Sequence, residues 1–111
     1  MSKFKDALNQ ITDPAVAGAK AEFSKLISDG KASSKAFIKA SAEQLEKWII
    51  AVGKKEMSRA EFDELVSSQK ILAKNFVLSQ GISARKRAEK LTVNALEIAA
   101  TKIIPGLLSA I

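Results

Sequence analysis

The sequence of 111 residues contains no cysteine, no histidine and no tyrosine. Without cysteine the chain has neither a disulfide nor a thiolate nucleophile, and without histidine it lacks the usual general base near neutral pH. Cysteine and histidine are also the common ligands of zinc and other transition metals. We therefore expect no metal, no cofactor and a reducing, cytoplasmic location.

Grouped carboxylates are the remaining candidates for catalysis, and they are few. Glu43 precedes Glu46 by three residues, and Glu61 is followed by Asp63 and Glu64. Two carboxylates act as acid and base when burial drives their pKa values apart, but these groups lie on predicted outer faces or at a predicted helix start. The glycines form no phosphate-binding loop. These observations predict a protein that is not an enzyme.

Long apolar runs are absent as well. No stretch approaches the roughly 18 consecutive apolar residues that span a bilayer. The charged start through Lys3 and Lys5 does not have the pattern of a secretory signal. We expect a water-soluble protein that is at most peripheral to a membrane.

Apolar residues recur every three or four positions throughout the chain, which is the spacing typical of helices, and no β-hairpin signal is present. The expected helices cover residues 1–12, 14–29, 34–52, 59–80 and 84–104, followed by an apolar tail over 105–111. Short links between helices favour antiparallel neighbours. The sequence thus predicts an all-α fold, an antiparallel bundle of four main helices with a short extra N-terminal helix, in a single domain over residues 1–111.

Polar side chains are expected to cap several helix starts. Asp13 is expected to cap the second helix, with Pro14 at the first helical position. Either Ser33 or Ser34 is expected to cap the third helix, and Ser83 the last.

The fourth helix has the most specific start signal. Ser58 and Glu61 have the spacing of a capping box, in which each side chain accepts a hydrogen bond from the backbone of the other residue. The side chains predicted to face the core from this helix are Phe62, Leu65, Val66, Gln69, Leu72, Ala73 and Phe76.

The last helix is apolar over an unusually wide arc, and Pro105 is expected to end it by removing a backbone donor. A surface helix normally buries a stripe somewhat over about 100° wide, and the apolar arc here is about twice as wide. This helix must therefore be covered on two sides. The cover is either the rest of its own bundle, a second copy of the chain, or a membrane surface.

The last helix and the tail form the expected binding surface. The tail has no charge after Lys102, so some partner surface is expected to cover it. The main hypothesis is a non-enzymatic interaction or assembly protein that binds itself, as a homo-oligomer, or another protein. The residues expected at this interface are Leu96, Ile103, Ile104, Leu107, Leu108 and Ile111.

A basic cluster lies near the start of the last helix, at Arg85, Lys86, Arg87 and Lys90. Residues 82–111 carry five Lys or Arg and two Asp or Glu, which leaves +3 of the net charge of +6 of the whole chain. One interpretation is an anion site that binds phosphate, an acidic partner or, together with the apolar tail, an anionic membrane surface. The other is that these side chains cap the C-terminal end of the preceding helix. Nucleic-acid binding is a weaker hypothesis, because Arg87 stands where a helix-turn-helix needs a buried aliphatic residue.

Overall fold

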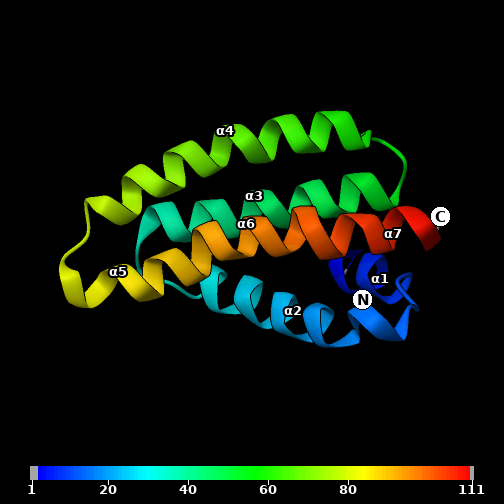
Figure 1. The fold of residues 1–111 in the computed structure, drawn as a ribbon, viewed down its shortest axis with the longest axis horizontal. Coiled ribbons are helices and arrows are strands. Elements are labelled where there is room, and N and C mark those ends of the chain that lie inside the picture. Colours follow the sequence, from blue (N-terminus) through cyan, green and yellow to red (C-terminus); the bar gives the residue numbers. More distant parts are fainter. Residues whose placement is uncertain (1–2, 111) are drawn as a thin grey trace.

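A computed structural model describes residues 3–110, and all regular structure in this range is helical (Figure 1). Its elements are α1 (Lys3–Asn9), the 3-10 turn η1 (Pro14–Val16), α2 (Ala17–Lys31), α3 (Ala36–Gly53), α4 (Arg59–Leu78), α5 (Ile82–Glu89), the π-helical turn η2 (Lys90–Asn94), α6 (Ala95–Ile98), the π-helical turn η3 (Ala99–Ile103) and α7 (Ile104–Ala110). Consecutive long helices run in opposite directions. The predicted all-α bundle of four main helices with a short N-terminal helix is therefore confirmed.

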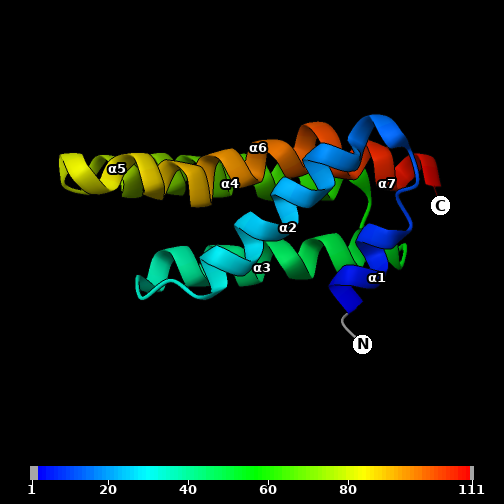
Figure 2. The same cartoon turned by 90° about the horizontal axis from the view of Figure 1, so that it is seen from below.

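The segments from α5 to α7 form one continuous helix, Ile82–Ala110, called here the C-terminal helix. It contacts α2, α3 and α4 along its length. Figure 2 shows that α4 and the C-terminal helix lie in one layer and that α3 lies in another, while α2 crosses obliquely between the layers. The sequence left three possibilities for what covers the apolar faces of this helix. In the structure the other helices of its own bundle cover it.

Two π-helical turns change the phase of the C-terminal helix. A π turn holds about one residue more than an α turn, so each one sets back the residues after it by about 100°. In a uniform α-helix Ile104 and Leu107 would lie about 140–160° away from Leu91. With the two π turns they return to within about 40° of Leu91, and all three side chains are buried. Many of the apolar side chains that a uniform α-helix would spread over a wide arc therefore face the core.

The predicted helix break at Pro105 is wrong, because α7 continues from Ile104 to Ala110. Pro105 is the second residue of α7 and lies one residue beyond a π turn, where the hydrogen-bond register changes. A proline at the start of an α-helical segment loses a donor that has no ordinary partner there, so the helix tolerates it. The segment after Pro105 is helical and docked on the bundle rather than a separate tail.

Two of the cap predictions are confirmed. The Asp13 carboxylate accepts a hydrogen bond of 2.9 Å from the backbone N–H of Ala15, with Pro14 at the first position. Ser58 and Glu61 form both hydrogen bonds of the capping box, each 3.1 Å long.

The serine caps of the third and last helices are wrong. The residues at these cap positions are Lys35 before α3 and Gly81 before α5, and neither makes a side-chain cap bond. Ser33 instead accepts a hydrogen bond from the backbone N–H of Lys35, which stabilises the turn before α3.

The N-terminal helix packs on its own bundle and ends at Asn9, three residues earlier than predicted. Its Phe4 ring contacts the buried Phe23 ring of α2 with the centroids 5.9 Å apart. Ala7, Leu8 and the following Ile11 are buried as well. α1 therefore closes the end of the bundle at which α7 also lies (Figure 1).

Two glycines of α2 differ in the space around them, and this difference predicts opposite effects of the same substitution. A Cβ at Gly30 would lie 2.8 Å from the Cβ of Ala42 in α3, whereas a Cβ at Gly18 meets no atom within 4 Å. We expect Gly30→Ala to lower the free energy of unfolding by about 1–3 kcal/mol through overpacking. Gly18→Ala should raise it by about 0.5 kcal/mol, because the unfolded chain loses entropy. Urea denaturation measures both, and a stabilising Gly30→Ala would contradict the close crossing of α2 and α3.

Candidate interaction surface

Most residues of the expected interface lie inside the bundle. The fully buried ones are Leu96, Ile103, Ile104 and Leu107, and Leu108 is half-buried. Ile111 lies outside the described residues. In this structure the fully buried side chains form the core of the chain itself and are not exposed to a partner.

The C-terminal helix is also the one helix in residues 3–110 that is long and apolar enough to cross a membrane, with a mean hydropathy of 1.3 in its most apolar window. Half of that window is buried against the rest of the chain. The core helix of a water-soluble bundle has the same two properties, because it is apolar where its neighbours cover it. The length and composition of this helix are therefore those of a buried core helix as well as those of a membrane-spanning helix.

The basic cluster does not form one site, and Arg85 has a structural role. Its Nε donates to the carbonyl of Gln80 at 3.0 Å, and its Nη2 donates to the carbonyl of Leu78 at 3.3 Å. The carbonyl of Leu78 belongs to the last residue of α4, where backbone acceptors have no partner within the helix, and that of Gln80 lies in the turn between α4 and α5. For Arg85 the interpretation as a cap of the preceding helix is therefore supported.

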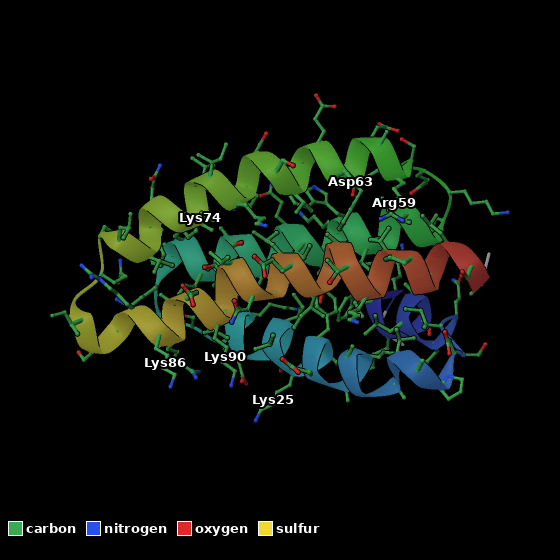
Figure 3. The ribbon with its side chains drawn as sticks, in the orientation of Figure 1. Lys25, Arg59, Asp63, Lys74, Lys86 and Lys90 are labelled. Carbon is green, nitrogen blue, oxygen red and sulfur yellow. The ribbon has the colours of Figure 1, made fainter. Side chains whose placement is uncertain are left out.

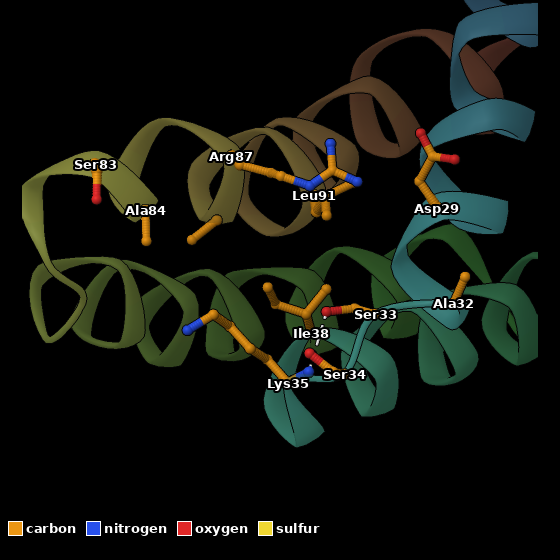
Figure 4. A pocket seen from close by; sticks show the side chains of 11 residues that line it. Asp29, Ala32, Ser33, Ser34, Lys35, Ile38, Ser83, Ala84, Arg87 and Leu91 are labelled. Carbon is orange, nitrogen blue, oxygen red and sulfur yellow. Dashed lines mark hydrogen bonds between the residues drawn. The ribbon is translucent and has the colours of Figure 1, made fainter.

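Arg87 points into a pocket of about 360 Å³ between α5 and the turn from α2 to α3 (Figure 4). Lys35 and three serines also line this pocket, but so does Asp29 of α2. An anion in the pocket would be attracted by the two cations and repelled by this carboxylate. The carboxylate of Asp29 therefore makes this pocket a poor binding site for an anion.

The other two basic residues of the cluster, Lys86 and Lys90, are exposed on the same side of the molecule as Lys25 of α2 (Figure 3). None of the three forms an ion pair within residues 3–110. They are thus available to a partner, whereas Arg85 is not.

A surface that sequence reasoning missed lies on α4. Every large aliphatic side chain that is exposed in residues 3–110 belongs to α4 or is the first residue of α5. These residues are Leu65, Ile71, Leu72, Leu78 and Ile82, with exposed fractions of 37%, 65%, 53%, 67% and 86%. Leu65 and Leu72 were predicted to face the core, and that prediction is wrong.

Helical spacing places four of these side chains on one side of α4. At about 100° per residue they fall within an arc of about 140°, together with two small polar residues. We call this arc the outer face of α4; its residues are Leu65, Ser68, Ile71, Leu72, Asn75 and Leu78, and all six are exposed. The outer face carries no charged side chain between Leu65 and Leu78.

Two aromatic side chains of α4, one on its buried side and one at the edge of the outer face, fix its position in the bundle. Phe62 is fully buried and lies edge-on to Trp48 of α3 with the ring centroids 6.4 Å apart. Phe76 stacks on Phe37 of α3 with the centroids 4.6 Å apart. Because α4 packs on α3 and the C-terminal helix along one side, its outer face remains in contact with solvent.

Charge is unevenly distributed along α4. Its first turns carry Glu61, Asp63 and Glu64, and Asp63 pairs with Arg59 at 3.5 Å. The backbone N–H and the hydroxyl of Ser58 hydrogen-bond to Glu61 and lower the pKa of its carboxyl, which favours the ionised form of this side chain. From residue 65 to residue 88 the chain has five Lys or Arg and no Asp or Glu. The chain is therefore acidic at the start of α4 and positively charged over the second half of α4 and the start of α5.

Within residues 3–110, no group of three or more His, Cys, Asp or Glu side chains is arranged to hold a metal ion. Comparison with known proteins found no matching family model, no matching curated protein and no matching solved structure. The candidate function therefore rests on the surfaces described above.

The capping role of Arg85 can be tested against its neighbour. We expect Arg85→Ala to lower the free energy of unfolding by about 1 kcal/mol, because the carbonyls of Leu78 and Gln80 lose their donors. Lys86→Ala, at an equally exposed position, should change it by less than about 0.5 kcal/mol. Arg85→Lys should restore only part of the loss, because lysine lacks the two-pronged geometry. Thermal and urea unfolding measure all three, and equal losses for Arg85→Ala and Lys86→Ala would contradict the cap.

Proposed function

We propose that this chain is a non-enzymatic assembly protein that binds a partner protein through the outer face of α4. The observation that carries the proposal is the gathering of all the exposed large aliphatic side chains of residues 3–110 on and next to this one helix. Scattered exposed apolar side chains are ordinary on a protein surface, whereas a contiguous patch marks an interaction site. We also propose a cytoplasmic location, which the absence of cysteine supports.

The outer face has the spacing that helices use to bind other helices. Leu65 and Leu72 are seven residues apart, and so are Ile71 and Leu78. Seven-residue repeats keep side chains on one seam along two packed helices. Burying these four aliphatic side chains would contribute on the order of several kcal/mol, which is enough to offset part of the entropy lost on association.

Photo-cross-linking in the cells that produce the protein tests this proposal. A benzophenone amino acid replaces Leu72 in one variant and Leu78 in another, and replaces the exposed residues Ser28 of α2 and Asn94 of the C-terminal helix in two controls. We expect protein adducts from positions 72 and 78 at least about tenfold above those from the controls, because an aliphatic seam excludes water around a bound partner. Ile71→Glu should suppress the adduct at position 78. Equal adducts at all four positions, or none, would refute the proposal.

A second candidate function is binding to an anionic lipid surface through the corner between α4 and α5. The observations that favour it are the 86% exposure of Ile82 and the run of five Lys or Arg without an acidic residue over 65–88. An exposed aliphatic side chain between lysines is a common arrangement in proteins that bind membrane surfaces. The apolar part of such a site would be this corner, since Leu107 is buried.

Vesicle flotation tests this second candidate. We expect the protein to float with vesicles that contain phosphatidylserine and to be released by salt. Lys86→Glu with Lys90→Glu should lower the vesicle binding constant at least about 30-fold, because each lysine near such a surface contributes about 1 kcal/mol. Lys39→Glu with Lys47→Glu changes the net charge equally on α3 and should have a smaller effect. The same loss in both double variants would mean that net charge, rather than the corner, causes the binding.

A further inference from the structure

We infer that the outer face of α4 binds the same face of a second copy of this chain, with the two α4 helices antiparallel and a two-fold axis between Ile71 and Leu72. This inference rests on the proposed function and identifies the partner that the outer face fits. The argument has three parts: the symmetry of the residue pattern, the chemistry of the residues that would meet, and the charge along α4.

The pattern of the outer face is the same in both chain directions. The central pair, Ile71 and Leu72, is aliphatic. Three positions away on either side stand small polar residues, Ser68 and Asn75, and three positions further stand Leu65 and Leu78. A surface that binds a copy of itself across a two-fold axis must be complementary to itself, and a pattern symmetric about its centre meets this requirement.

An antiparallel pair about this centre matches like with like. Leu65 of one copy lies opposite Leu78 of the other, and Ile71 lies opposite Leu72. Ser68 lies opposite Asn75, and a hydroxyl and an amide can hydrogen-bond to each other. No charged side chain of the outer face has to leave water, because none is present between Leu65 and Leu78.

The charge along α4 selects the antiparallel arrangement over the parallel one. Parallel helices would also bring identical residues together, but they would place Glu61, Asp63 and Glu64 beside the same three carboxylates of the other copy. They would likewise bring the two basic corners together, which repel each other. In the antiparallel pair the acidic start of each α4 lies near the corner between α4 and α5 of the other copy, where Lys74 and the basic residues of α5 lie. Opposite charges then meet at both ends of the seam.

The mass of the protein in solution is the first test. Light scattering behind a sizing column should give twice the chain mass of 11.9 kDa at high loading concentration and approach the chain mass on dilution. Ile71→Glu with Leu72→Glu should give the chain mass at every concentration while circular dichroism and the melting temperature stay close to those of the parent, because both side chains are more than half exposed. Ser28→Glu with Asn94→Glu adds the same charge at exposed positions elsewhere and should leave the dimer intact.

Cysteine cross-linking tests the direction of the pair, and the absence of native cysteine makes the result direct. Ser68→Cys and Asn75→Cys are made in separate chains that are mixed and oxidised. The mixture should form a disulfide-linked dimer, because the two positions face each other across the axis. Ser68→Cys alone should link poorly, because two copies of residue 68 would lie about 10 Å apart along the helices, whereas a disulfide needs Cβ atoms about 3.5–4.5 Å apart.

Each outcome has a defined meaning. Linking in the mixture but not in Ser68→Cys alone supports the inference, and efficient linking of Ser68→Cys to itself overturns it in favour of a parallel pair. The chain mass at every concentration also overturns it. In that case a photo-adduct at position 72 with another protein would leave the proposed function standing, and no adduct there would end both.

Discussion

The structure depends on the burial of one long helix by all the others. The C-terminal helix contacts α2, α3 and α4, and its fully buried side chains at Leu96, Ile103 and Leu107 occupy the centre of the core. Apolar burial is the main favourable term in folding, so the other helices are arranged around this one. α4 meets the centre from one side, and its opposite side, the outer face, stays exposed. The same arrangement that completes the core therefore creates the surface proposed for binding.

The fold class and two helix caps could be predicted from the sequence, because they depend on neighbouring residues. The apolar spacing identifies helices, and the caps at Asp13 and Ser58 are made within three residues along the chain. The π turns could not be predicted, since they become favourable only when tertiary packing repays their poorer hydrogen bonds. Reading the C-terminal helix at constant pitch therefore widened its apolar arc. The break at Pro105 was predicted from the missing backbone donor, because the π turn that accommodates this proline was not foreseen.

The candidate site was harder to predict than the fold, for a related reason. An apolar side chain has the same appearance in a sequence whether a neighbouring helix covers it or not, so Leu65 and Leu72 were assigned to the core. Only the position of α3 and the C-terminal helix decides which part of an apolar stripe is covered. The basic cluster has the same difficulty, because Arg85 finds the carbonyls of Leu78 and Gln80 only when the chain folds back after α4. The sequence did contain one signal of this surface, the symmetric spacing of Leu65, Ile71, Leu72 and Leu78. A single apolar stripe that faces the core does not need such symmetry.

The two π turns are the places at which the C-terminal helix can lose one residue without rotating the side chains that follow. Each π turn corresponds to one residue inserted into an α-helix. Loss of one residue between Ala99 and Ile103 would turn this π turn into a regular α-helical turn, and the side chains after it would keep their direction, so Ile104 and Leu107 would stay in the core. In related sequences that share this packing, aliphatic residues along the helix would exchange freely for one another. Single-residue deletions would be found at the two π turns, whereas elsewhere between Leu91 and Leu107 the number of residues would stay constant.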